Sequence, residues 1–106
     1  MTKRILIRPK ASQDLDDHFA YIAERNGEAA LQFFDNVRLT LAQLARMPQM
    51  GRVYVTQNPR LQGLRKWAVR LFKRYLIFYI ERDDAIEIVR ILYASQDLSS
   101  ILDREK

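Results

Sequence analysis

Two amphipathic helical segments in direct succession constrain the fold of this chain more than any other feature of its sequence. Apolar residues recur at helical spacing from residue 15 to 23 and again from 30 to 45. Asn26 and Gly27 stop the first segment and leave a break of only a few residues, and Pro48 prevents the second from continuing. Because the connection is so short, we expect the helices to fold back on each other as an antiparallel hairpin. Each helix has one apolar face, so the hairpin needs a second layer to cover it.

Polar residues predict where these helices begin and end. Ser12 is a suitable N-cap for the first helix. Asp14, Asp16 and Asp17 would then fall in its first turns, where the helix dipole favours negative charge, which explains them without a metal site. Gly27 is expected just past the C-terminus of this helix. The second helix is expected from about residue 28 to 46.

Strand-forming residues dominate most of the remaining chain. The expected strands are 3–9, which Pro9 would end, then 64–71, 74–81 and 85–93. The links at 72–73 and 82–84 have hairpin length, so the last three strands should be antiparallel neighbours. A short helix is expected at 97–104, capped by Asp97 or Ser99. The order β-α-α-β-β-β predicts an α+β fold, in which the helical hairpin packs on one face of an antiparallel sheet and leaves the other face open.

The composition fits a single small domain over residues 1–106. With 48% hydrophobic and 29% charged residues, the chain is typical of a folded domain. The absence of cysteine excludes a disulfide framework and a thiol nucleophile, and one histidine with three glycines argues against a metal cluster or a phosphate-binding loop. We therefore expect no metal and no cofactor. The sequence also lacks a signal peptide and an apolar run of the roughly 18 residues that a membrane span needs, so a cytoplasmic protein is expected.

The positive charge of the chain is concentrated in one segment. The net charge is +5, yet residues 60–82 alone carry +6. The basic residues of this segment are Arg60, Arg65, Lys66, Arg70, Lys73, Arg74 and Arg82, opposed only by Glu81. A confined positive field interleaved with aromatic residues favours a polyanion or an acidic partner. The alternative is a solvated strand edge protected by its charges.

Strand alternation divides this basic segment between the two faces of the sheet. Lys66 and Arg70 are expected on one face and Arg65 on the other, at the rim of the sheet. Lys73 and Arg74 are expected at the turn that follows. Arg90 interrupts an otherwise apolar strand, so it must be paired, exposed at the rim or functional.

Several conspicuous side chains have ordinary structural explanations. His18, the only histidine, is expected to be a surface or boundary residue. The adjacent Phe33 and Phe34 should both belong to the core of the hairpin, and Trp67 should pack between the sheet and the helices. Tyr75 and Tyr79 share one face of their strand, where core packing is favoured slightly over binding.

The order and spacing of several sequence pieces resemble those of the RelE/ParE superfamily of bacterial toxins from toxin–antitoxin pairs. The matching pieces are Ser12–Asp16, Tyr21–Asn26, Leu44–Gly51, Gly63–Arg65, Tyr75–Tyr79, Arg90–Tyr93 and Gln96–Asp97. The long hairpin and the Tyr-Leu-Ile-Phe-Tyr run are more similar to the ParE branch than to the ribonuclease branch. This chain departs from a common family ending, since Tyr93 and Gln96 stand where histidine and arginine are usual.

The resemblance implies a plasmid-stabilising toxin that inhibits DNA gyrase, arrests growth and is silenced by a cognate antitoxin. It leaves a messenger-RNA endoribonuclease as the alternative, in which Arg65, Arg90 and Tyr93 would be catalytic. Arginine is a poor proton donor and free tyrosine titrates near pH 10, so these residues suit anion binding better than acid–base catalysis. We therefore expect a gyrase inhibitor more than an enzyme.

Partners of this toxin are expected to include the antitoxin, DNA gyrase and other copies of the chain. An acidic and apolar antitoxin segment would fold as it binds, over the open sheet face and the grooves of the hairpin. A homodimer through exposed apolar helix surface, or a toxin–antitoxin hetero-oligomer, is a further expectation. The expected partner-binding residues are Arg65, Lys66, Arg70, Lys73, Arg74, Arg90 and Tyr93.

Overall fold

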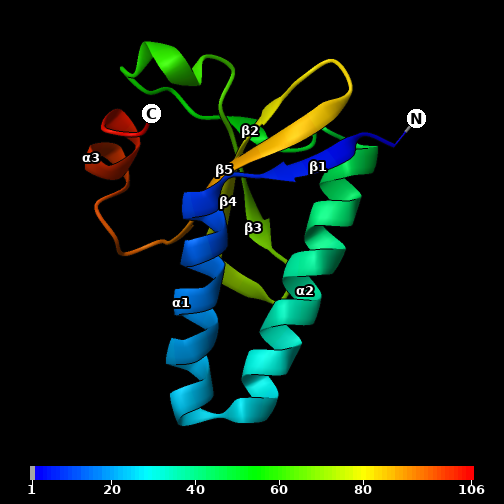
Figure 1. Cartoon of the computed structure of the whole chain (residues 1–106), viewed down its shortest axis with the longest axis vertical. Helices are drawn as coiled ribbons and strands as arrows, with labels where there is room; N and C mark the ends of the chain where they lie inside the picture. The colour runs from blue at the N-terminus through cyan, green and yellow to red at the C-terminus, as the bar shows by residue number, and fades with distance from the viewer. Residues whose placement is uncertain (1) are drawn as a thin grey trace.

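Two long helices lie side by side against one face of a five-stranded sheet, and a short helix lies near the C-terminus (Figure 1). The computed structural model describes residues 2–106. The helices are α1 (Pro9–Arg25), α2 (Gly27–Arg46), α3 (Leu98–Asp103) and a 3-10 helix, η1 (Pro59–Leu61). The strands are β1 (Arg4–Ile7), β2 (Arg52–Val53), β3 (Arg65–Val69), β4 (Phe72–Glu81) and β5 (Ala85–Tyr93). The α+β class expected from the sequence is confirmed.

The sheet has the strand order β1-β5-β4-β3-β2, and one of its pairings differs from the expected antiparallel arrangement. β3, β4 and β5 are antiparallel neighbours as expected, but β1 pairs with β5 in parallel. β1 and β5 are far apart in the chain, so no tight turn imposes an antiparallel direction on them. The two-residue edge strand β2 and the helix η1 lie in a segment expected to be irregular.

Both long helices begin at different residues from those expected. α1 begins at Pro9, whose fixed φ suits the first helical position, so Ser12 is inside the helix and no acidic residue falls in its first turn. Asn26 separates the helices and caps α2, since its side chain accepts a hydrogen bond from the amide of Ala29 at 3.1 Å. Gly27 therefore opens α2 and does not end α1.

The core between helices and sheet contains most of the apolar residues expected there. Its buried members include Val37, Leu41 and Leu44 of α2, together with Ile77, Tyr79, Ile88 and Ile91 of the sheet. Tyr75 and Tyr79 both lie in this core, and Trp67 packs against it, as expected. The expectation for the phenylalanine pair is half right. Phe33 is fully buried, whereas Phe34, the next residue around the helix, points away from the core and is 39% exposed. The Phe34 ring contacts the ring of Phe19 of α1 edge-on.

The second face of the sheet is covered, contrary to the expectation of an open face. Phe78, Ile80 and Val89 pack there against Leu61 of η1 and Leu102 of α3. Asn58 fastens the C-terminal segment, because its side-chain amide donates to the carbonyls of Leu102 and Glu105 at 2.9 and 2.6 Å. Asp97 caps α3 by accepting from the amide of Ser100 at 3.4 Å. This face is therefore not accessible to a binding partner while α3 and the η1 segment cover it.

The turn between β3 and β4 also differs from the expected one. Arg70 and Leu71 form it, and Leu71 has a positive φ of 66°, a left-handed backbone conformation that is common in turns. Lys73 and Arg74 consequently belong to β4 and not to the turn. Both side chains are exposed.

An ion-pair cluster around Glu87 ties β1, β5 and the β4–β5 turn together and should make stability depend on pH. Glu87 accepts from Arg8 at 2.7 Å and from Arg82 at 2.7 and 2.9 Å. Burial alone would raise the pKa of Glu87, but the hydrogen bonds from Arg8 and Arg82 outweigh it and lower the pKa below its ordinary value.

We expect Glu87→Gln to remove part of the acid sensitivity of the fold. Because the folded pKa is depressed, the stabilisation by Glu87 is present above the unfolded pKa near 4.3 and is lost as pH falls through the lower folded pKa. The variant should be about 1 kcal/mol less stable at neutral pH and equally stable in acid, as measured by urea unfolding across pH. The exposed Glu24 provides a control, Glu24→Gln, that should leave the pH profile unchanged. A constant difference between Glu87→Gln and the parent at every pH would contradict this prediction.

Candidate functional site

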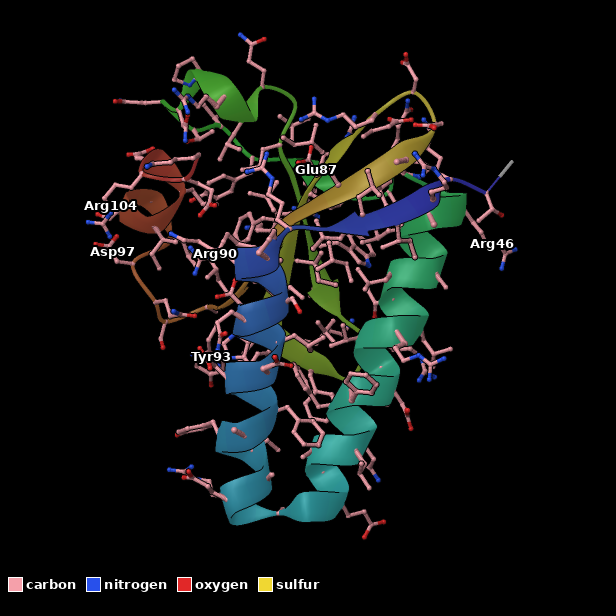
Figure 2. The ribbon with its side chains drawn as sticks, viewed as in Figure 1. Arg46, Glu87, Arg90, Tyr93, Asp97 and Arg104 are labelled. Atoms are coloured by element: carbon pink, nitrogen blue, oxygen red, sulfur yellow. The ribbon has the colours of Figure 1, made fainter. Side chains whose placement is uncertain are left out.

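A surface hollow of about 320 Å³ lies where the middle of α1 meets the ends of β4 and β5. Its lining residues are His18, Tyr21, Tyr75, Tyr93, Ser95 and Gln96. The Tyr75 and Tyr93 rings meet edge-on with centroids 4.8 Å apart, and His18 contacts Tyr75 in the same manner at 4.9 Å. Figure 2 shows Tyr93 beside the middle of α1. Four aromatic rings thus gather in one hollow. Two of them come from α1 and two from β4 and β5, which follow α1 only after α2 and β3 along the chain.

Cationic side chains surround this aromatic hollow. Tyr93 and Tyr75 also line a second hollow together with Lys73 and Arg74. Arg74 donates from Nε to the Tyr93 hydroxyl at 3.0 Å, and its guanidinium lies 5.4 Å from the centre of that ring. Arg25 lies over the Tyr21 ring at 3.9 Å. The structure therefore brings together Lys73, Arg74 and Tyr93 from the expected binding residues.

α1 fastens the exposed edge of β5 through Asp14 and His18. β4 pairs with β5 at Ile91 on one side, but β1 pairs only with the first half of β5, so no strand lies beside Ile91 on the other side. The Asp14 carboxylate accepts from the Ile91 amide at 3.0 Å, and His18 Nε2 lies 2.8 Å from the Ile91 carbonyl. Because a carbonyl can only accept, Nε2 must carry the proton. The residues lie four apart on one helical face, which places both on the same strand edge. His18 is a half-buried boundary residue, as expected.

Arg90 belongs to a charged triad that joins α1, β5 and the C-terminal segment. Its guanidinium donates to both carboxylate oxygens of Asp14 at 2.7 and 2.8 Å and to Glu105 at 3.0 Å. The side chains of Arg90, Asp14 and Glu105 are only 15%, 11% and 6% exposed. The hydrogen bonds to Asp14 raise the pKa of Arg90 against the opposing effect of burial, and Glu105 adds to the rise. Figure 2 shows Arg90 between α1 and α3, so it is the paired residue among the three alternatives left open by the sequence.

Asp14 is thus part of a buried pair and not of a dipole-matched helix start. The sequence held one signal for it, a lone arginine in an apolar strand, which requires a carboxylate nearby. The sequence did not identify this carboxylate, because Asp14 lies 76 residues before Arg90 along the chain.

Arg65 holds the loop that follows α2. Its guanidinium donates to the Gly51 carbonyl at 2.7 Å and to Gln49 at 3.4 Å. The Tyr79 hydroxyl reinforces the same loop, since it donates to the Pro48 carbonyl at 2.7 Å and accepts from the Gly51 amide at 2.9 Å. Arg65 lies opposite Tyr79 in the sheet, whereas Tyr93 lies opposite Tyr75. Arg65, Arg90 and Tyr93 therefore occupy three separate places.

The remaining two basic candidates lie on other parts of the surface. Arg70 docks the β3–β4 turn onto α2, donating to Asn36 at 3.1 Å through its guanidinium and to Thr40 at 3.0 Å through its amide. Lys66 lies on the opposite face of β3 from Trp67, with its ammonium 5.6 Å from the centre of the Tyr54 ring. Alternation correctly separated Lys66 from Arg65, but Arg70 belongs to the turn and does not share the face of Lys66.

The titration of the buried tyrosines argues against a role for either as a base. Burial, with the neighbouring Tyr93 and Tyr21, raises the pKa of Tyr75 above its ordinary value. Burial also raises the pKa of Tyr79, although the hydrogen bond from Gly51 and the charge of Arg65 oppose it. Both groups stay protonated at neutral pH.

The described part of the chain has neither a group of metal ligands nor a helix that could span a membrane. Within residues 2–106, no three histidine, cysteine, aspartate or glutamate side chains are grouped as metal ligands would be. Over the same residues, no helix combines the length and the apolar character needed to cross a bilayer.

Comparisons with known proteins agree with this architecture. No curated protein matches the chain. Among solved structures, a chain of the chromosomal ParDE TA system from P. aeruginosa superposes with a TM-score of 0.71 at 19% identity, covering 89% of this chain and 98% of that one. At that identity the likeness establishes the fold. A family model described as ParE toxin of type II toxin-antitoxin system, parDE, matches residues 5–98, which is nearly the whole chain. The match begins in β1 and ends in α3, and on this ground the chain belongs to the ParE toxin family.

Proposed function

We propose that this chain is a toxin that acts in the cytoplasm by inhibiting DNA gyrase, and that a cognate antitoxin neutralises it. Inhibited gyrase would block replication and arrest growth, and a plasmid carrying the pair would be stabilised. Membership of the ParE family over residues 5–98 carries this proposal. The proposal treats the chain as an inhibitor and not as an enzyme.

The bonding of the basic residues supports an inhibitor over a ribonuclease. Metal-free RNA cleavage needs groups that move protons and that stabilise the phosphorane. Arg90 is engaged by two carboxylates and Arg65 Nη1 by two backbone carbonyls, so both guanidinium groups already have structural partners within the chain. Lys73, Arg74 and Tyr93 remain, and they can bind an anion without proton transfer.

The antitoxin is proposed to bind along the free edge of β1 and at the hollow with its basic rim. β1 is an edge strand whose Ile5, Leu6 and Ile7 are 38%, 44% and 42% exposed. An exposed apolar edge of this kind favours addition of a strand from a partner. Acidic residues of the same segment would complement Lys73 and Arg74.

We expect the double change Lys73→Glu and Arg74→Glu to slow antitoxin association about tenfold at low salt and to flatten its salt dependence. Both side chains are exposed, so thermal stability should stay within about 0.5 kcal/mol of the parent. The matched control is Lys10→Glu with Arg104→Glu, which reverses the same amount of charge at exposed positions away from the hollow. Equal association rates for the two double variants in stopped-flow mixing would eliminate the hollow as the antitoxin site.

Induced expression of the chain tests toxicity itself. We expect growth arrest, and recovery when a small protein with a DNA-binding N-terminus and an acidic tail is co-expressed from the neighbouring gene. Normal growth of cells that contain folded protein in quantity would refute the toxin proposal.

One observation favours the ribonuclease as a second candidate function. The hollow places His18, whose Nδ1 is the ring nitrogen left to accept a proton, in the same group of residues as Tyr93 and Ser95. A messenger-RNA cleavage assay with the parent and with His18→Gln, which keeps a side-chain N–H donor for Ile91, tests this alternative. Cleavage by the parent that the variant lacks would support it over gyrase inhibition.

A further inference from the structure

The outer face of α2 is an apolar and charged surface that nothing in the described chain covers. This face points away from the sheet, directly opposite the buried stripe of the same helix. Its residues are Glu28, Leu31, Asp35, Arg38, Leu39, Ala42 and Arg46. Leu31 and Leu39 are 60% and 57% exposed, and Arg46 projects from the end of the helix in Figure 2. Two large leucines on one exposed helix face are more than single scattered apolar residues.

The charges on this face divide at the midpoint of the helix. Glu28 and Asp35 lie in the first half, and Arg38 and Arg46 lie in the second. Within residues 2–106, none of these four forms an ion pair with another side chain. The face therefore carries one acidic half and one basic half, both free to pair outside the chain.

We propose that this face binds the same face of a second copy, with the two α2 helices antiparallel about a two-fold axis. α2 runs from Gly27 to Arg46, so its midpoint lies next to Asn36 and Val37. In a fully overlapped antiparallel pair, residues equally distant from the midpoint lie opposite each other. Asp35 of each copy then faces Arg38 of the other, and Leu31 faces Ala42.

The same arrangement brings the ends of the two helices into register. Glu28 lies within one residue of the position opposite Arg46, so a second pair of complementary charges forms at each end of the interface. The small side chain of Ala42 leaves room for the exposed Leu31 of the second copy. A two-fold axis repeats each contact, so one chain supplies both partners of every pair.

The charge pattern selects a second copy over other occupants. A parallel pair of the same helices would oppose like charges along its whole length, which is destabilising. An acidic antitoxin segment would meet Glu28 and Asp35 on half of the surface. Only an antiparallel copy matches both halves at once. The proposed antitoxin surface, on β1 and the hollow, is made of residues other than those of this face.

Light scattering and sedimentation equilibrium of the purified chain test the proposal with two single charge reversals. Arg38→Glu and Asp35→Arg each place like charges at the centre of the homodimer. We expect each variant alone to raise the dimer Kd about tenfold or more. A mixture of the two restores opposite charges across the interface and should form a heterodimer at the concentration where each alone is monomeric. The chain carrying both changes should dimerise like the parent.

Two controls separate the interface from the fold. Lys10→Glu changes an exposed charge on α1 and should leave the Kd unchanged. Thermal unfolding should be similar for all variants, because Asp35 and Arg38 are exposed and unpaired within the described chain. A monomeric parent at all concentrations would overturn the proposal. So would a dimer that tolerates Arg38→Glu, or a mixture of the single variants that stays monomeric. A chain that dimerises as predicted but is not toxic would contradict the proposed function and leave the proposed dimer supported.

Discussion

Replacing Arg90 by alanine is expected to lower the free energy of unfolding by about 3–5 kcal/mol. The change leaves the carboxylates of Asp14 and Glu105, both largely buried, without a counter-charge. It also removes the link between α1, β5 and the C-terminal segment that covers the second sheet face. Urea unfolding followed by circular dichroism measures the loss, with Arg104→Ala as the matched control. Arg104 is exposed, so its removal should cost less than about 0.5 kcal/mol.

A combined variant separates the effect of charge from that of lost packing. In Arg90→Met with Asp14→Asn and Glu105→Gln no charge remains buried, and the amide introduced at position 14 can still accept from the Ile91 backbone through its side-chain oxygen. We expect this triple variant to recover most of the stability that Arg90→Ala loses. A triple variant as unstable as Arg90→Ala would mean that packing, and not the unpaired charge, accounts for the loss.

Replacing Gly51 by alanine is expected to lower the free energy of unfolding by about 1–3 kcal/mol. A Cβ at this position would collide with the Tyr79 hydroxyl and would lie 2.8–2.9 Å from two ring carbons. The Tyr79 ring is fully buried and its hydroxyl is held by Pro48 and Gly51, so it cannot move aside. The loop held by Arg65 must shift instead.

Gly27→Ala is the control for this change. A Cβ at Gly27 meets nothing within 4 Å, and alanine favours a helix over glycine at the first turn of α2. We expect this variant to be as stable as the parent or slightly more so when both glycine variants are unfolded in urea. Equal stability of Gly51→Ala and Gly27→Ala would show that the loop is free to move away from Tyr79.

The sequence was sufficient to predict those helices and strands whose arrangement depends on the segments next to them along the chain. The hairpin of α1 and α2 follows from two apolar stripes and a short link, and β3, β4 and β5 follow from their tight turns. Local errors shifted helix starts and the β3–β4 turn by a few residues, and the larger errors concern contacts between distant segments. The parallel pairing of β1 with β5 and the cover of η1 and α3 over the second face leave no local periodicity in the sequence.

The sequence predicted that basic and aromatic residues would form the candidate site. It did not predict which of the basic residues would belong to it. Lys73, Arg74 and Tyr93 do gather in one place. Arg65, Arg70 and Arg90 carry the same charge, yet each is held by partners within the chain. A local excess of positive charge cannot distinguish a cation that faces solvent from one that is paired by a carbonyl or by a carboxylate far along the sequence. The place of His18 in the hollow was not predicted, because only the fold brings α1 to the end of β5.

Supercoiling of relaxed plasmid DNA by purified gyrase, with the folded chain added, tests the proposed function most directly. We predict that supercoiling falls as the chain is titrated in, and that prior addition of the antitoxin restores it. The Lys10→Glu and Arg104→Glu double variant should inhibit like the parent, which controls for nonspecific binding of a basic protein to DNA. Undiminished supercoiling at concentrations of chain that arrest growth would contradict gyrase as the target.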